Sequence, residues 1–317
     1  MYIIICGPTA LGKSEAAVIL AEKTGGEVVS ADSMQVYRGM DIGTSKITTA
    51  ESRGIKHHMI DIADPSENFT VARYKKGAEE ALDSIKAAGK TAIMAGGTGL
   101  YINSVIRGLM EAAEPSPELR LKLRKEQEDR GTEYMADMLK EKDPEAAGLV
   151  DLKNGRRVIR ALELILANNM KLSELRQKTG GTAYNDRYII FFLSAGREYI
   201  YARVNARVDK MMKNGLPEEA ERLLENGVGE TARHAIGYKE LFEYIRAGKR
   251  GPLPADAVKK ATRAYALRQL TWFKRYKDAV QVDMEKNSPL QAALFMEEAV
   301  KAALNEACGG GDDNGAA

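Results

Sequence analysis

A glycine-rich segment near the N-terminus carries residue types that bind phosphate. Residues 7–14 match the pattern G-x-x-x-x-G-K-S/T and lie between an apolar run and a stretch of helix-forming residues. Glycines let backbone N–H groups converge on phosphate oxygens, Lys13 neutralises outer oxygens, and Ser14 offers a ligand to Mg²⁺. We therefore expect a site for a polyphosphate with magnesium, although the motif does not specify ATP because any diphosphate fits the same loop. The residues expected to form this site are Gly7, Pro8, Thr9, Ala10, Leu11, Gly12, Lys13 and Ser14.

A carboxylate, Asp32, follows the second apolar run of the chain. That run, residues 27–30, is expected to be a strand, and the carboxyl ends of neighbouring strands face one another in a doubly wound sheet. Asp32 is therefore expected close to the phosphate loop. A carboxylate in that place can serve as a magnesium partner or as a general base, and it can also simply cap the turn that follows.

The apolar run 91–95 ends in glycines and a threonine instead of an acidic residue. In nucleotide hydrolases and kinases, a second strand usually ends in an Asp that holds the water shell of the metal. Residues 96–99 read Gly-Gly-Thr-Gly, which suits a close-packed floor under a ligand better than a metal site. This pattern weakens the interpretation as a nucleotide kinase without excluding it, because Asp32 or Asp61 can take that role.

The elements that must position these residues alternate between strand and helix, which predicts an α/β fold with a parallel sheet. Strands are expected at 2–6, 27–30, 59–62 and 91–95, with helices at 15–23 and 71–88. Charged helical segments then follow at 117–130, 132–140 and 154–168, and no strand pattern returns until 188–193. We interpret 114–186 as an inserted all-helical subdomain, and 1–113 with 187–308 as a P-loop NTPase-like core.

The last third of the chain is mostly helical and locally basic. Helices are expected at 197–214, 217–226, 239–247 and 255–276, before a strand at 279–282, a last helix and a flexible tail at 309–317. Residues 233–278 contain 12 Lys or Arg against 4 Asp or Glu, with aromatic side chains between the cations. Such a stretch suits nucleic acid, but it equally suits an amphipathic core helix.

Composition excludes several classes of protein. The 317 residues include 47 Lys and Arg, 45 Asp and Glu, and 44% hydrophobic residues, so a disordered chain or a disulfide-stapled mini-protein is ruled out. Only two cysteines occur, too few for a disulfide framework or a cysteine-based zinc site. No run resembles a signal peptide or approaches the ~20 apolar residues of a membrane span. We expect a cytoplasmic protein that has no membrane association and no obligate protein partner.

The ordered set of motifs resembles the family of bacterial tRNA dimethylallyltransferases, also called tRNA isopentenyltransferases or IPP transferases. The resemblance runs from residue 2 to about residue 283, and the order of the motifs makes it specific. The segments that carry it are 7–14, 32–44, 57–61, 96–101, 157–163, 235–238 and 268–272.

The resemblance implies transfer of a dimethylallyl group from dimethylallyl diphosphate to N6 of the adenosine on the 3′ side of the anticodon, with release of diphosphate. By similarity, Thr9, Lys13 and Ser14 hold the diphosphate with Mg²⁺, and Arg207 reaches it from a helix. Asp32 accepts the proton of the adenine amine, which is a poor nucleophile until a base removes that proton. The catalytic residues implied are thus Asp32, Lys13 and Thr9.

The resemblance also implies contacts to tRNA, with the helical insertion binding the anticodon stem-loop. The target base must leave its stack to reach Asp32, so a channel open to both substrates is expected. Asp151, Lys153 and Leu267 depart from the family pattern, which affects the expected tRNA contacts and not the chemistry. The residues expected to contact tRNA are Asp32, Ser33, Met34, Gln35, Thr98, Arg120, Arg156, Arg157, Arg160 and His234.

Three other functions fit parts of the sequence. A small-molecule phosphotransferase could use ATP in the same loop. Prenylation of free adenine nucleotides is disfavoured, because a nucleotide-sized substrate needs neither the arginine-bearing insertion nor the long basic segment. A non-catalytic RNA-binding module is disfavoured by the pairing of Lys13 with Asp32 at neighbouring strand ends.

Overall fold

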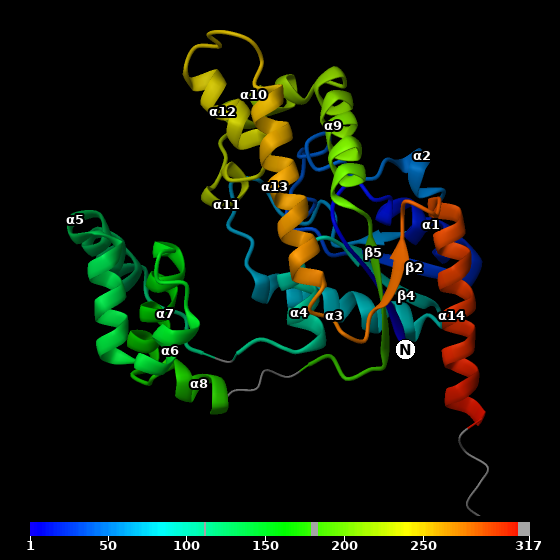
Figure 1. Ribbon diagram of the computed structural model, residues 1–317, viewed down its shortest axis with the longest axis horizontal. Coiled ribbons are helices and arrows are strands. Elements are labelled where there is room, and N and C mark those ends of the chain that lie inside the picture. The colour runs from blue at the N-terminus through cyan, green and yellow to red at the C-terminus, as the bar shows by residue number, and fades with distance from the viewer. Residues whose placement is uncertain (111, 179–182, 310–317) are drawn as a thin grey trace, which may run out of the picture. The chain divides into compact units, whose positions relative to one another are not determined.

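Six parallel strands form one sheet (Figure 1). The structure, a computed structural model, describes residues 1–110, 112–178 and 183–309. The strands lie in the order β3-β2-β4-β1-β5-β6, and each neighbouring pair is parallel. The expected α/β fold is confirmed. The strands are β1 Tyr2–Cys6, β2 Gly26–Ser30, β3 His57–His58, β4 Thr91–Gly96, β5 Tyr188–Ser194 and β6 Val280–Asp283.

The register of the sheet brings the ends of three strands to one edge. Cys6 of β1 pairs with Gly96 of β4, and Ser30 of β2 pairs with Ala95. The segments that leave these strands therefore start side by side, as expected for the carboxyl edge of a doubly wound sheet. β1 is buried along its whole length, which agrees with the continuous apolar run of a central parallel strand.

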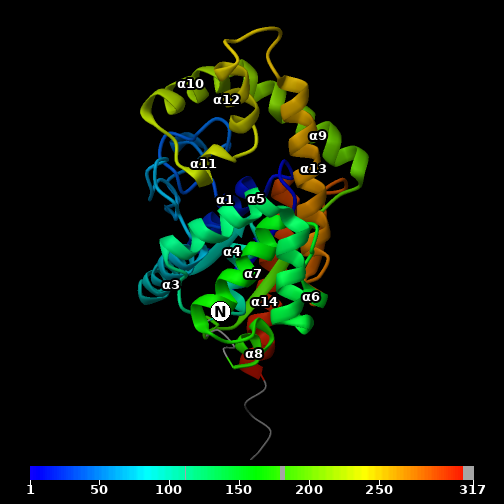
Figure 2. The same cartoon turned by 90° about the vertical axis from the view of Figure 1, so that its left-hand side faces the viewer.

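The chain divides into two compact units, Met1–Val105 with Asn185–Ala317, and Ile106–Tyr184. In the larger unit, α1 packs against α14 and α9 against α13. Figure 2 shows α10, α11 and α12 grouped together, and α10 also packs against α9. The helices of the larger unit are α1 Lys13–Thr24, α2 Thr49–Ser52, α3 Val71–Ala87, α4 Gly99–Ile106, α9 Arg197–Lys213, α10 Leu216–Asn226, α11 Glu230–Arg233, α12 Tyr238–Arg246, α13 Ala255–Phe273 and α14 Pro289–Gly309.

The secondary-structure elements in the described part of the smaller unit are all helices, and the unit has its own apolar core. Leu123, Leu139 and Leu162 are among the side chains buried in that core. The two helices expected at 117–130 and 132–140 are present as α5, which is broken at Gly131, where φ is 83°. The expected insertion 114–186 begins eight residues after the first residue of this unit, Ile106, and ends two residues after its last residue, Tyr184. Its helices are α5 Pro117–Lys142, α6 Pro144–Leu149, α7 Gly155–Asn168 and α8 Leu172–Lys178.

The strand expected at 59–62 is wrong. The strand in this region is β3, which ends at His58. Met59 and Asp61 have φ values of 63° and 56°, in the left-handed region that an extended strand cannot include. The apolar residues predict a strand, but the backbone turns here, and its N–H groups donate to the loop after β2, from Asp61 to Gln35 O and from Ile62 to Val36 O.

Several short helices were not predicted, because four to eight residues give too little periodicity to read. They are α2, α4, α6, α8 and α11. The flexible tail expected at 309–317 lies outside the described residues except for Gly309, the last residue of α14.

Candidate functional site

The phosphate loop occupies the turn between β1 and α1. Gly7 can only be glycine, because a Cβ here would overlap the carbonyl of Leu193, and its φ is +147°. Gly12, at φ 77°, precedes the first helical residue, Lys13. The N-terminus of α1 therefore opens toward the loop with its backbone N–H groups and partial positive charge.

Lys13 lies inside this loop, where its Nζ donates to the carbonyl of Pro8 at 2.8 Å. Burial, followed by the nearby charge of Arg207, lowers the pKa of Lys13 to about 8. Burial also lowers the pKa of Arg207, although the charge of Asp32 opposes that effect. Asp32 is the carboxylate whose charge acts on both groups, and no ion pair to Lys13 or Arg207 is formed within the described part of the chain. Two cations held this close together suit an anionic ligand.

A cavity of about 730 Å³ opens above the phosphate loop. Thr9, Lys13 and Ser14 line it from the loop, and Asp32 lines it from the end of β2. Its cationic lining outnumbers its carboxylates, which fits a diphosphate. The cationic residues are Lys13, Arg53, Arg203, Arg207 and Lys210, and the acidic ones are Glu15, Asp32 and Glu51.

Asp32 uses one carboxylate oxygen for structure. Its Oδ1 accepts from the backbone N–H groups of Met34 at 2.9 Å and Gln35 at 3.3 Å. Among the described residues, no hydrogen bond reaches Oδ2. The turn-capping role considered from the sequence is therefore real, but it occupies only Oδ1 and leaves Oδ2 available to a ligand in the cavity that Asp32 lines.

A second cavity, of about 190 Å³, meets the first at the same carboxylate. Its lining is more apolar, with Met211, Ile236 and Val258 among its residues. His234, which is exposed, lines its rim together with Ser33 and Met34. The residues that line both cavities are Thr9, Asp32, Arg207 and Tyr265. Two ligands entering from the two cavities would thus meet at Asp32.

The loop after β4 forms a close-packed floor, as its glycines predict. A Cβ on Gly96 would overlap the backbone of Ala31, and one on Gly97 would overlap the side chain of Gln269. Thr98 Oγ1 accepts from the backbone N–H of Ser33 at 3.0 Å. The floor therefore holds the segment after Asp32 against the sheet.

Four residues at this site were missed as site residues. Gln269 bridges two loops, since its Oε1 accepts from Thr9 N and its Nε2 donates to the carbonyl of Gly97, both at 2.9 Å. Tyr265 lies one turn earlier on α13, and burial, with the charge of Asp32, raises its pKa to about 12, so its hydroxyl keeps its proton. Arg203 donates to Ala10 O at 3.1 Å. The spacing of Arg203, Arg207 and Lys210 at i, i+4 and i+7 is a signal that could have revealed one cationic helix face.

The expected tRNA-binding arginines belong to the smaller unit. Arg156, Arg157 and Arg160 are exposed in the first turns of α7, whose N-cap is Asn154. Arg160 pairs with Glu163 at 3.0 Å, and Arg120 on α5 pairs with Glu114 at 2.5 Å. These positions are accessible to a phosphate backbone.

The described residues contain no cluster of three or more His, Cys, Asp or Glu side chains that could hold a metal ion. The hydroxyl of Ser14 and the carboxylate of Asp32 line one cavity, and hard oxygen donors of this kind fit Mg²⁺ when phosphate oxygens and water complete the set. No helix in the described part of the chain is long and apolar enough to cross a membrane.

The chain is similar to known proteins over most of its length. Residues 35–276 match the family model described as IPP transferase. A tRNA dimethylallyltransferase from Caldanaerobacter subterraneus is 46% identical over 280 residues, 86% of this chain and 89% of the relative. The solved tRNA isopentenylpyrophosphate transferase of Bacillus halodurans is 37% identical with a TM-score of 0.71, and 96% of this chain and 97% of that one are covered. A eukaryotic dimethylallyltransferase acting on tRNA is 26% identical with a TM-score of 0.79, covering 95% of this chain and 79% of that one.

Proposed function

This chain belongs to the IPP transferase family and transfers a dimethylallyl group to tRNA, and on that premise we propose its donor, acceptor and catalytic residues. The donor is dimethylallyl diphosphate, and the acceptor is N6 of the adenosine on the 3′ side of the anticodon. The observation that carries this proposal is that Asp32 lines both cavities and that the phosphate loop lines the larger one.

In the proposed reaction, the larger cavity holds the diphosphate and the second cavity admits the unstacked adenine. The N6 lone pair forms a bond to C1 of the dimethylallyl group, and the C1–O bond to the diphosphate breaks with its electron pair leaving on oxygen. Asp32 Oδ2 accepts the N6 proton. Lys13, Arg207 and the backbone N–H groups of the loop stabilise the charge that grows on the departing diphosphate.

The proposed metal is Mg²⁺, held by Ser14 and by oxygens of the diphosphate. When bound, it would neutralise part of the charge on the leaving group. Ser14 stands in the first turn of α1 and lines the larger cavity, so its hydroxyl is in a place to serve as a ligand.

The proposal is tested by incubating the purified chain with unmodified tRNA and dimethylallyl diphosphate and analysing the nucleosides by mass. We expect one prenylated adenosine per susceptible tRNA, and none when free adenosine monophosphate replaces tRNA or when ATP replaces the donor. The absence of prenylated adenosine at every magnesium concentration would overturn the proposal.

The metal role gives a first prediction. Ser14→Ala should raise the magnesium concentration needed for half-maximal activity, because one hydroxyl ligand is lost. Ser14→Thr keeps the hydroxyl and should titrate like the parent protein. A titration curve that is the same for Ser14→Ala and the parent would remove Ser14 from the metal site.

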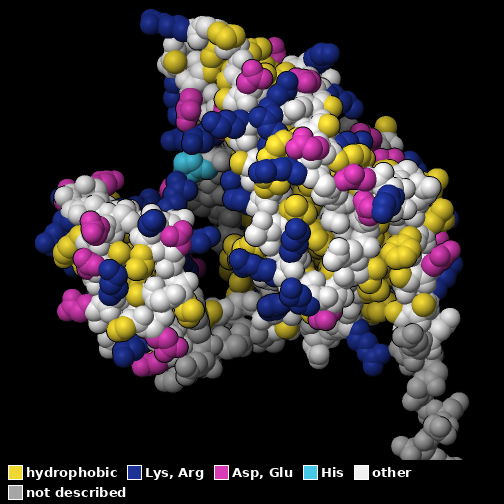
Figure 3. Space-filling model, viewed as in Figure 1, with side chains coloured by type: hydrophobic (Ala, Val, Ile, Leu, Met, Phe, Trp, Pro, Cys, Tyr) yellow, Lys and Arg dark blue, Asp and Glu magenta, His cyan; other side chains and the backbone are white. Residues whose placement is uncertain are grey.

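Binding of tRNA is proposed to involve the exposed arginines of α7 and a basic face of the larger unit. Figure 3 shows Lys and Arg side chains spread over the face that α13 occupies. Basic faces of this kind suit the phosphate backbone of a nucleic acid. We expect this reaction to take place in the cytoplasm without an obligate protein partner.

A second prediction follows for α7. Replacing Arg157 and Arg160 by Ala should weaken tRNA binding and lower the slope of log affinity against log salt by roughly one per arginine. The affinity for the donor should change little. Lys76→Ala, which removes an exposed charge from α3, is the control and should leave the slope unchanged. An unaltered tRNA slope together with a loss of donor binding would contradict the assignment.

A further inference from the structure

We propose that Glu219 is a positioning residue for the donor site. It lies on α10 and holds the backbone of residues 41–44 in place. Glu219 lines neither cavity and so touches neither substrate. It acts through Thr44 on Arg207 and Gln35, both of which line the larger cavity. The inference rests on the proposed function insofar as it takes the ligand of Arg207 to be a diphosphate.

Glu219 is a buried carboxylate, with only 2% of its surface exposed. Its oxygens accept from three consecutive backbone N–H groups, those of Asp41 at 3.1 Å, Ile42 at 2.9 Å and Gly43 at 3.1 Å. No basic side chain in the described part of the chain pairs with it. A concave run of N–H groups around an anion therefore compensates its charge in place of a cation.

Tyr238 completes this arrangement from α12. Its hydroxyl donates to Glu219 Oε1 at 2.5 Å and accepts from the backbone N–H of Gly43 at 3.2 Å. Burial, and next the charge of Glu219, raises the pKa of Tyr238 well above its ordinary value, so the hydroxyl remains a donor. The ring lies so close to Gly43 that a Cβ there would overlap it. Segments from α10, α12 and the loop after β2 are thus tied together.

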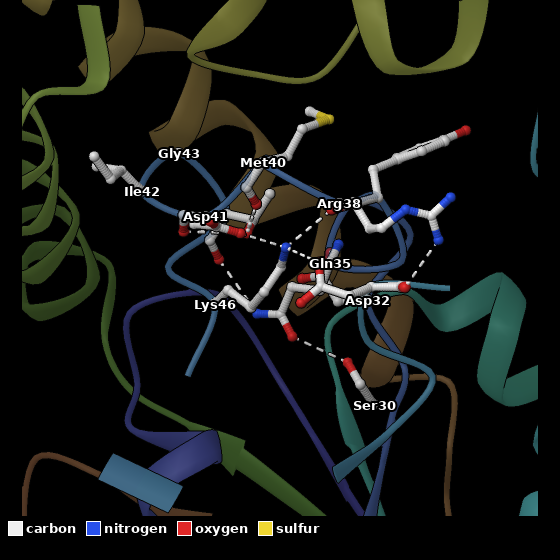
Figure 4. A network of polar contacts seen from close by, with 12 residues as sticks. Ser30, Asp32, Gln35, Arg38, Met40, Asp41, Ile42, Gly43 and Lys46 are labelled. Atoms are coloured by element: carbon white, nitrogen blue, oxygen red, sulfur yellow. Dashed lines mark hydrogen bonds and ion pairs between the residues drawn. The ribbon is translucent and has the colours of Figure 1, made fainter. Parts of the chain in front are cut away.

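Thr44, the residue that follows the run 41–43 bound by Glu219, connects this loop to the larger cavity. The carbonyl of Thr44 accepts from Arg207 Nη2 at 3.2 Å and from Gln35 Nε2 at 3.3 Å. Gln35 is held at its other end, since its Oε1 accepts from Ser30 Oγ at 3.0 Å. Figure 4 shows Gln35 near Asp32, with Asp41, Ile42 and Gly43 in the same loop. The orientation of Thr44 therefore sets where Arg207 points.

Lys46 makes a second set of contacts that hold the same loop. Lys46 Nζ donates to the carbonyl of Tyr37 at 2.9 Å and pairs with Asp41 and Asp61, each at 2.5 Å. Both carboxylates are about half exposed and are screened by water, although the Lys46 side chain is itself buried. Glu219 holds the three backbone N–H groups directly before Thr44, so a change at Glu219 should affect Thr44 more strongly than a change at Lys46.

Glu219→Gln tests this role while keeping the size of the side chain. The new amide nitrogen would face backbone N–H donors, so at least one of these hydrogen bonds is lost and residues 41–44 loosen. We expect the affinity for inorganic pyrophosphate to fall roughly tenfold, the lower end of the loss that is typical when the partner that orients a metal-ligating side chain is mutated. In an Arg207→Lys background the same change should cost much less, because Glu219 acts through Arg207.

The measurement is calorimetric binding of pyrophosphate to the full chain, with thermal unfolding of each variant recorded beside it. Asp143→Asn is the matched control, because Asp143 is also a buried carboxylate that accepts backbone N–H groups, those of Ala146 and Ser173, but in the smaller unit. It should lower the unfolding temperature and leave pyrophosphate affinity unchanged. Should Glu219→Gln fail to fold, Tyr238→Phe removes one hydrogen bond to the same carboxylate and should weaken binding in the same direction.

Two results would overturn the inference. One is a folded Glu219→Gln variant with lower unfolding temperature but parental pyrophosphate affinity, which is the signature of a purely structural carboxylate. The other is equal loss of affinity in the parent and Arg207→Lys backgrounds. A parent protein that binds no pyrophosphate and prenylates no tRNA would instead mark the failure of the proposed function, so the two failures are distinguishable.

Discussion

Asp32→Asn is expected to lower the single-turnover rate of prenyl transfer by about 10²–10⁴-fold, the usual contribution of a positioned general base. The side-chain oxygen of Asn can still accept from Met34 and Gln35, so the turn after β2 should persist. The amide placed where Oδ2 stands cannot take up the amine proton. The affinities for tRNA and for the donor should therefore change much less than the rate.

Single-turnover kinetics with saturating donor and tRNA separates this role from the alternatives. Asp64→Asn is a matched control, because Asp64 also accepts from a backbone N–H two residues on, that of Ser66, and it lines neither cavity. Its rate should equal that of the parent. If raised magnesium restores the Asp32→Asn rate, Asp32 is a metal partner, and if lower temperature restores it, Asp32 is only a cap.

The elements that carry the chemistry were predictable because their signals are local. The phosphate loop, Asp32 and the glycines after β4 each follow a short apolar run, and parallel pairing then brings the three strand ends together. The resemblance to IPP transferases is confirmed by the family match over residues 35–276. The strand expected at 59–62 failed because an apolar run cannot reveal that Met59 and Asp61 adopt left-handed backbone conformations.

The partners of these elements were not predictable, since they come from distant parts of the chain. Gln269 forms a hydrogen bond with Thr9, and Glu219 forms hydrogen bonds with the loop after β2. The sequence around either residue contains no pattern that predicts these partners. A buried Glu on a helix looks in the sequence like any polar residue of α10. Hydrogen bonds of this kind depend on tertiary packing, which residue spacing does not encode.

Lys13→Ala is expected to reduce donor affinity and turnover together, with kcat/KM for the donor falling roughly 10²–10³-fold at pH 7, as when one donor to a developing oxyanion is removed. The ammonium group faces the diphosphate both in the bound donor and in the departing group. Its loss therefore affects the ground state and the transition state. Normal turnover in the variant would remove the phosphate loop from the mechanism.

The pH dependence of the ratio of kcat/KM between the parent protein and Lys13→Ala provides a sharper test of the role of Lys13. The lowered pKa of about 8 means that Lys13 of the free protein is charged below pH 8 and becomes neutral above it. Since kcat/KM reports the ionisation of free protein and free substrate, the ratio between parent and Lys13→Ala should be largest below pH 8 and shrink as pH rises through that value. Taking the ratio cancels the titration of the donor itself, which is common to both proteins. A ratio that stays constant from pH 6 to pH 10 would mean that Lys13 keeps its proton throughout, so that burial beside Arg207 does not control its charge.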